Sequence, residues 1–177
     1  MPGNEKGLVQ VYTGEGKGKT TAALGLCFRA AGHGLRSVIL QFMKGQIDYG
    51  ELKSAERFDG LITIIQGGRP NFVSRERPDP EDRRLALETL ERARVLIADP
   101  GLDLLVLDEI NVAVDFGLVP LDEALALIHA RHPGLELVLT GRGARPEIIV
   151  CADLVTEMRE IKHYWKSGVP CRTGIER

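Results

Sequence analysis

The sequence is poor in aromatic residues and cysteine, has no long hydrophobic run, and carries no excess of charge of either sign. Aromatic side chains make up 5% of the 177 residues, and the 3 cysteines are too widely spaced to form a paired ligand motif. Separated cysteines in odd number favour a reduced, cytoplasmic compartment. No apolar run approaches the roughly 20 residues that cross a bilayer, and the first residues lack the hydrophobic region of a signal peptide.

The charge balance argues against a general attraction to polyanions. The chain has 23 Lys and Arg residues against 25 Asp and Glu residues. No long-range field therefore draws it to nucleic acid or to an anionic membrane, and we expect neither as a partner. With 44% hydrophobic and 27% charged residues, the composition is that of a globular protein, and residues 1–177 are expected to form a single domain around one core.

Short apolar runs alternate with helical patterns along the chain. Most of the runs are apolar at consecutive positions, which is typical of parallel strands covered on both faces. They lie at Leu8–Tyr12, Ser37–Phe42, Leu61–Ile65, Asp103–Leu107 and Leu135–Leu139, with a weaker run at Leu154–Met158. This alternation predicts an α/β fold in three layers, with a mostly parallel central sheet of about six strands.

Helical spacing and boundary residues place the helices between these strands. The patterns cover Thr20–Ala31, Glu81–Ala98 and the segment 121–128, and a further short helix is expected to open at Pro146. Gly32 is expected to end the first helix in a left-handed conformation. The segment Gly67–Pro80 contains three prolines and is predicted to be an irregular loop.

The segment Thr13–Thr20, TGEGKGKT, has the features of a phosphate-binding P-loop. It follows a predicted strand and opens a predicted helix, as such a loop requires. Gly14, Gly16 and Gly18 would let backbone N–H groups turn toward phosphate oxygens at the positive end of the helix. Lys19 would reach the phosphates and the Thr20 hydroxyl would ligate magnesium. The P-loop and sheet together predict the RecA-like architecture of P-loop NTPases.

Two alternatives to a P-loop would also account for the glycines. The usual P-loop begins with glycine, whereas Thr13 stands first here, so a purely structural glycine-rich turn is one alternative. A Rossmann dinucleotide site is the other. It is disfavoured because Lys19 occupies the position of its third glycine and because the second strand lacks a terminal acid.

An acidic strand end supports the nucleotide site. The run Leu104–Leu107 is followed by Asp108 and Glu109, the Walker B pattern in which an acid holds Mg²⁺ against phosphates. A solvated strand edge would show the same residues. The P-loop earlier in the chain favours the metal-binding interpretation, with Thr20, Asp108 and Glu109 as the metal-site candidates.

Taken together, seven segments resemble the ATP:corrinoid adenosyltransferase family of cobalamin synthesis and salvage, in that family's order. They are Thr13–Ala23, Gln41–Gly45, Asp108–Asn111, Leu139–Ala144, Asp153–Arg159, Lys162–His163 and Gly174–Glu176. The resemblance implies transfer of the 5′-deoxyadenosyl group of ATP to the cobalt of a reduced corrinoid, with release of tripolyphosphate. Because Co(I) is itself a nucleophile, this chemistry needs no Ser, Cys or His nucleophile, and we find no convincing triad in the sequence.

The resemblance assigns expected roles to individual residues. Lys19, Glu109 and Phe72 are the catalytic candidates. Arg142, in the turn after the fifth strand, is a candidate contact for the nucleotide or corrinoid, with a helix-capping turn as its alternative. The residues expected to bind ATP are Thr13, Gly14, Gly16, Lys17, Gly18, Lys19, Thr20, Thr21 and Arg142.

The segment expected to contact the corrinoid departs from the sequence pattern of many family members. They carry Phe-Thr-Trp after a glycine, and such apolar bulk displaces the lower axial ligand of cobalt. Here the segment reads Gly68-Arg69-Pro70-Asn71-Phe72-Val73, with a single aromatic residue. Phe72 is our candidate for that role, and its alternative is a residue that anchors the loop to the core.

The expected ligands are ATP with Mg²⁺ or Mn²⁺ and a reduced corrinoid as the second substrate. The resemblance also implies a homodimer and leaves room for an electron-donating reductase as partner. Two alternative functions are compatible with a P-loop: a kinase or ATPase, and a non-catalytic module that senses ATP or corrinoid. The single aromatic residue of the Phe72 loop keeps the second alternative open.

Overall fold

A computed structural model describes residues 6–45, 49–71 and 73–176. Its centre is a 6-stranded, parallel sheet in the order β3-β2-β4-β5-β1-β6. The predicted α/β class is therefore confirmed. The strands are β1 (Val9–Thr13), β2 (Ser37–Phe42), β3 (Ile62–Gly67), β4 (Leu104–Asp108), β5 (Glu136–Thr140) and β6 (Leu154–Glu157).

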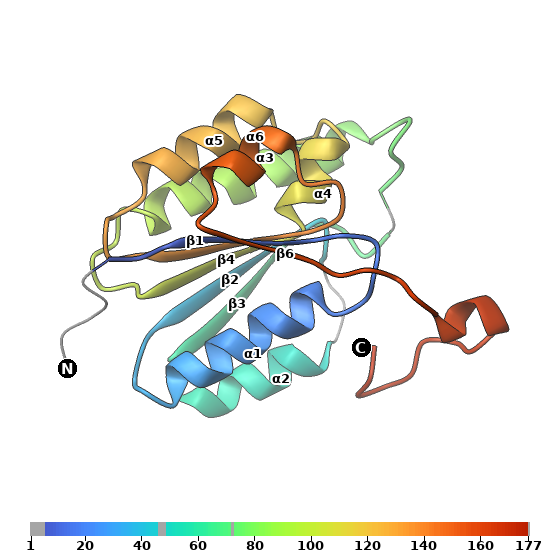
Figure 1. Ribbon diagram of the computed structural model, residues 1–177, viewed down its shortest axis with the longest axis horizontal. Coiled ribbons are helices and arrows are strands. Elements are labelled where there is room, and N and C mark those ends of the chain that lie inside the picture. The colour runs from blue at the N-terminus through green and yellow to red at the C-terminus, as the bar shows by residue number, and fades with distance from the viewer. Residues whose placement is uncertain (1–5, 46–48, 72, 177) are drawn as a thin grey trace.

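Helices cover both faces of the sheet and complete the three layers (Figure 1). On one face, α3 (Pro80–Leu96), α4 (Ile110–Asp115), α5 (Leu121–Ala130) and α6 (Pro146–Cys151) pack over one hydrophobic cluster that includes Leu90 and Ile128. On the other face, α1 (Lys19–Ala31) and α2 (Gly50–Ala55) pack over a second cluster that includes Ala23 and Cys27. Two 3₁₀ turns, η1 (Glu56–Phe58) and η2 (Tyr164–Ser167), complete the elements.

Burial of the strands follows their place in the sheet. Every residue of the inner strands β2 and β4 is buried, as the consecutive apolar runs predicted. The strand β6 differs, since all its residues are exposed and it lies at the edge beside β1. The expectation of strands covered on both faces, made for most of the runs, is confirmed for β2 and β4. The exposed strand β6 is the run that was weaker in the sequence.

The strand order brings the candidate residues to one edge of the sheet. Parallel strands end on the same side, and ligands of α/β proteins bind outside those carboxyl ends. The P-loop follows β1, Lys44 follows β2, Asp108 ends β4, and Arg142 follows β5. Because β5 lies between β1 and β4, its last residue, Thr140, stands between the P-loop and the two acids.

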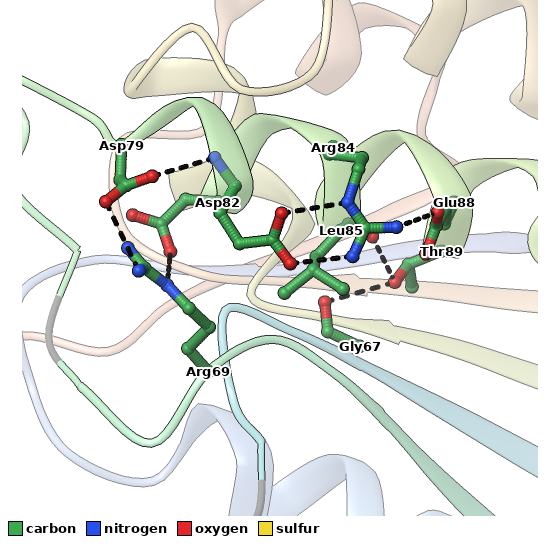
Figure 2. A network of polar contacts seen from close by, with 9 residues as sticks. Gly67, Arg69, Asp79, Asp82, Arg84, Leu85, Glu88 and Thr89 are labelled. Atoms are coloured by element: carbon green, nitrogen blue, oxygen red, sulfur yellow. Dashed lines mark hydrogen bonds and ion pairs between the residues drawn. The ribbon is translucent and has the colours of Figure 1, made fainter.

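The loop between β3 and α3 is tied together at its two ends (Figure 2). The carboxylate of Asp79 caps α3 by accepting the Glu81 N–H at 2.9 Å. Arg69 donates to Asp82 at 2.7 Å and to the same Asp79 at 3.2 Å. The described residues between β3 and α3 form neither helix nor strand. The irregular loop predicted for Gly67–Pro80 is confirmed, although these two bounding residues belong to β3 and α3.

Two local features differ from the sequence-based expectation. Gly32 has φ -61 and is right-handed, and the left-handed residue of that turn is Gly34 with φ +74. Gly32 is the C-cap of α1 as predicted, and only its expected left-handed conformation was wrong. The helices α2 and α4 were not predicted. The α4 sequence is rich in Ile and Val, which favour strands, and it forms one short helix because Glu109 turns the chain with φ 64.

Gly67 lets α3 lie close to β3, and its replacement tests that packing. A Cβ at Gly67 would lie 1.9 Å from Thr89 Oγ1 and 2.9 Å from Thr89 Cβ, and the Thr89 hydroxyl contacts the Gly67 carbonyl at 3.2 Å (Figure 2). We expect Gly67→Ala to lower the free energy of unfolding by about 1–3 kcal/mol, because β-branched Thr89 is stiff.

Urea denaturation measures this effect, and Gly25→Ala is the matched control. A Cβ at Gly25 meets nothing within 4 Å, so alanine should stabilise α1 by up to about 1 kcal/mol. Equal stabilities of the two variants would contradict the close packing of α3 on β3.

Candidate active site

The P-loop is held in an open turn by its glycines and by the chain that follows β6. Gly14 has φ +93 and Gly18 has φ +120, conformations that residues with a Cβ rarely adopt. A Cβ at Gly14 or at Gly16 would lie 2.5 or 2.7 Å from the carbonyl oxygen of Met158. The Gly16 N–H donates to that oxygen at 2.6 Å. The shape of the loop therefore depends on glycine and on the segment after β6.

The N-terminus of α1 has the character of an anion site. Gly18 is its N-cap and supplies no side-chain cap, so the first N–H groups of the helix lack intrahelical acceptors. Lys19 is a buried residue, 7% exposed, and its ammonium donates to the carbonyls of Gly14 at 2.6 Å and Gly16 at 2.8 Å. One of its three protons remains for a ligand. Burial lowers the pKa of Lys19, while the charge of Glu109 opposes this.

Three donors from three separate segments converge on the Asp108 carboxylate. Its Oδ1 accepts the Thr20 hydroxyl at 2.8 Å and the Thr140 hydroxyl at 2.7 Å. Its Oδ2 accepts from the Lys44 ammonium at 2.9 Å. Asp108 itself is fully buried, and hydrogen bonds to an ionised group in such surroundings are strong. The predicted metal residues Thr20 and Asp108 are thus brought into direct contact.

Glu109 is positioned beside Asp108 by an unusual backbone conformation. Its φ of 64 lies in the left-handed region, and its N–H donates to the Thr140 hydroxyl oxygen at 2.9 Å. Burial, and then the charge of Asp108, raise the pKa of Glu109, while Lys44, Lys19 and Arg142 oppose the shift. One hydroxyl, that of Thr140, therefore binds both the carboxylate of Asp108 and the backbone of Glu109.

Lys44 is held at the site by its backbone. It follows Met43, which has φ 60, and its carbonyl accepts the Gly68 N–H at 2.9 Å. Burial alone would lower the pKa of Lys44, but the charge and hydrogen bond of Asp108 outweigh it and raise the pKa. Lys44 and Thr140 were not predicted as site residues. Their only signal was membership of the segments that carry the family resemblance.

A cavity of about 1050 Å³ lies over this edge of the sheet, at the upper end of the sizes that are usual for small-molecule sites. The P-loop forms one side and residues of the β3–α3 loop form another. The predicted residues that line it are Gly16, Lys17, Gly18, Lys19, Thr20, Thr21, Glu109 and Arg142. Thr13 does not line it. Its hydroxyl instead accepts the N–H of Ala144, a residue of the loop after β5, at 3.3 Å.

Arg142 and Phe72 are the two further candidates. Arg142 pairs with Glu15 of the P-loop at 3.4 Å, and both side chains are mostly exposed. Phe72 lies outside the described residues, whereas its neighbours Asn71 and Val73 line the cavity. The structure thus brings the P-loop and the predicted corrinoid loop to the same cavity.

The oxygen ligands present suit a hard cation that also binds phosphate. Thr20, Asp108 and Glu109 offer only oxygen atoms. The described residues contain no group of three or more His, Cys, Asp or Glu side chains able to hold a metal. Mg²⁺ is commonly bound by one or two carboxylates together with substrate phosphates, and needs no such cage. These residues therefore fit magnesium or manganese bound together with a nucleotide.

Among the helices of the described ranges, none has both the length and the apolar character needed to cross a membrane.

Comparison with solved structures finds a protein of similar fold. The chain is similar to a KaiC-like protein from the archaeon Pyrococcus horikoshii, with a TM-score of 0.55 and 20% identity, over 90% of this chain and 76% of that one. At this identity the likeness concerns the fold alone. It agrees with the P-loop architecture predicted from the sequence.

Comparison with sequences is more specific. The corrinoid adenosyltransferase of Pseudomonas aeruginosa is 39% identical over 98% of this chain and 85% of its own length. The corrinoid adenosyltransferase CobA of Salmonella typhimurium is 35% identical over 97% and 86%, and that of Escherichia coli is 34% identical over 98% and 87%. The family model of the ATP:corrinoid adenosyltransferases BtuR/CobO/CobP matches residues 5–177. The chain therefore belongs to the ATP:corrinoid adenosyltransferase family.

Proposed function

We propose that this chain, acting as a single domain over residues 1–177, joins C5′ of ATP to the Co(I) of a reduced corrinoid and releases intact tripolyphosphate. The observation that carries the proposal is the cavity shared by the P-loop and the β3–α3 loop. In the reaction the cobalt electron pair forms the Co–C5′ bond. The C5′–O bond breaks and its electrons leave with the triphosphate. Holding the two substrates in one cavity supplies the alignment that such a displacement needs.

The residues around the P-loop are suited to stabilise the leaving group. As tripolyphosphate departs, negative charge grows on the oxygen that was bound to C5′. Lys17 and Lys19 line the cavity, and the N-terminus of α1 adds oriented N–H groups. Donors fixed in advance of the reaction stabilise such charge without reorganising. In this proposal Gly14, Gly16, Gly18, Thr21 and Arg142 complete the ATP site.

The acidic residues are proposed to hold a metal ion against the nucleotide. Thr20, Asp108 and Glu109 would bind Mg²⁺ or Mn²⁺, which when bound would neutralise charge on the triphosphate. Glu109 would then act as a metal ligand, whereas in an ATPase it would orient water. The hydroxyl of Thr140 holds the carboxylate of Asp108 and the backbone N–H of Glu109.

The corrinoid is proposed to occupy the part of the cavity away from the P-loop. Apolar side chains are among the lining of the cavity, with Met43 after β2, Val73 in the β3–α3 loop, Val112 of α4 and Phe116 directly after α4. They would pack against the macrocycle and exclude water from cobalt. We propose that Phe72 presses on the lower axial face, a role that the lining by its neighbours Asn71 and Val73 supports.

The setting of the reaction is also a proposal. All three cysteines are free, which supports a reducing cytoplasm where a reductase would supply Co(I). The exposed strand β6, with Leu154 and Val155 at 45% and 41% exposure, supports a homodimer through this edge.

Analysis of the phosphorus products tests the reaction. The protein is mixed anaerobically with Mg-ATP and a reduced corrinoid, and we expect tripolyphosphate together with a cobalt–carbon chromophore. Lys19→Ala should slow product formation about 10–100-fold or more, because charge-assisted hydrogen bonds of about 1.5–3 kcal/mol are lost. ADP with phosphate would instead identify a kinase or ATPase, and unchanged ATP a sensing module.

Replacing Thr140 tests the orientation of the two acids. Thr140→Val removes the donor to Asp108 and the acceptor for the Glu109 N–H, so we expect Mn²⁺ affinity in the presence of ATP to fall about 10–100-fold. Thr140→Ser keeps the hydroxyl and should stay much closer to the parent. Calorimetric titration gives the affinities, and equal values for the Val and Ser variants would refute this role.

Phe72→Ala tests the proposed corrinoid contact. ATP affinity should be unchanged, because the proposed role is on the corrinoid side, while adenosylation of the corrinoid should become slower. Single-turnover rates with a corrinoid reduced beforehand, and then with one reduced in the assay, separate binding from reduction. An unaltered rate in both assays would rule out the assignment.

A further inference from the structure

The cationic side chains of the cavity are paired with groups of the protein itself. Lys44 binds Asp108 at 2.9 Å, Arg142 pairs with Glu15 at 3.4 Å, and Lys19 is held by two P-loop carbonyls. Binding of a metal and a triphosphate adds charges of both signs to this balanced set. These ligands would compete with the internal pairs. Among the ion pairs that the described cations of the cavity make, the pair of Lys44 with Asp108 is the most buried.

We infer that Lys44 exchanges partners during the proposed reaction, binding Asp108 before the substrate arrives and the triphosphate afterwards. The inference rests on the proposed function, because its ligand is the metal-bound triphosphate. Lys44 lines the cavity, and its side chain is 21% exposed whereas that of Asp108 is 0% exposed. The ammonium therefore lies where the buried carboxylate meets the cavity.

Competition for Asp108 drives the exchange. Thr20 and Thr140 both donate to Oδ1, and Lys44 donates to Oδ2. A metal ion bound to this carboxylate would stand beside the ammonium, and two cations in a site of low dielectric repel strongly. Once displaced, the ammonium needs another anionic partner because an unpaired charge in such surroundings is unfavourable. Phosphate oxygens in the same cavity provide that partner.

The exchange needs movement of the side chain only. The Lys44 carbonyl is fixed by the Gly68 N–H at 2.9 Å. A Cβ at Gly45 would lie 1.7 Å from the Gly68 carbonyl oxygen, so the two loops touch. A flexible four-carbon stem on a fixed backbone suits an ammonium that changes partner.

The change of partner by Lys44 couples binding of the metal ion to binding of the nucleotide. A metal ion alone must displace Lys44, and a nucleotide alone must draw Lys44 away from Asp108 and leave this buried acid with fewer donors. When both bind, each relieves the penalty of the other, which is positive coupling. Lys44 would thus favour joint binding of metal and triphosphate over binding of either one.

Lys44→Met tests the inference through two equilibria that should move in opposite directions. Mn²⁺ affinity without nucleotide, from the electron spin resonance of the free ion, should rise several-fold because its competitor is gone. ATP affinity in EDTA, from calorimetry, should fall about 10–100-fold because a charge-assisted contact is lost. Lys53→Met, at an exposed lysine of α2, makes the same change in net charge and should leave both constants within about twofold.

Opposite shifts support the exchange and cannot come from misfolding, which would weaken both ligands. Tighter Mn²⁺ binding with unchanged ATP affinity would overturn it, since Lys44 would then only neutralise Asp108. Weaker binding of both ligands, or no change in either, would overturn it as well. The phosphorus products of the parent protein stay tripolyphosphate in all these cases, so failure of this inference is distinct from failure of the proposed function.

Discussion

The carboxylate of Asp108 joins four parts of the chain at one point. It ends β4, and it receives hydrogen bonds from α1, from β5 and from the segment after β2. A buried carboxylate requires such partners, because desolvated charge is otherwise strongly unfavourable. The relative positions of the P-loop helix and the strand ends are therefore tied to the hydrogen bonds of one side chain. Glu109 depends on the same point through the hydroxyl of Thr140.

The glycine loop adds a second constraint from the opposite side. Gly14 and Gly16 pack against the Met158 carbonyl so closely that no Cβ fits. The segment after β6 thus contacts and supports the glycine loop. The lysines of that loop line the cavity. A preorganised arrangement of donors is what a highly charged leaving group requires, since little reorganisation remains for the moment of reaction.

Much of this arrangement could be predicted from the sequence because its signals are local. The strand–helix alternation, the P-loop and the acids after Leu107 are each contained in short segments, and β2 begins and ends at the predicted residues. The order of the strands was not predicted, because periodicity carries no information on which strands are neighbours. The roles of Lys44 and Thr140 depend on that order. Neither stands beside Asp108 in the sequence, and both reach it only because β2 and β5 flank β4.

The short helix α4 is a second feature that local sequence signals did not predict. Its Ile and Val residues are typical of a strand, and the left-handed Glu109 that precedes it overrides that preference. A residue with a Cβ in this conformation is uncommon and tends to occur where function requires it. The conformation points the chain away from the sheet directly after the two acids, and in this way it leaves the cavity open above them.

The place of β1 in the sheet also determines when the site can form. Its two neighbours are β5 and β6, so Val9 pairs with Leu137 and Gln10 with Leu154. Contacts between residues so distant in sequence form slowly. During synthesis, the P-loop strand emerges before both of its neighbours and has no partner in the sheet until β5 has left the ribosome. Nucleotide can therefore stabilise the completed fold but cannot guide the folding of its first half.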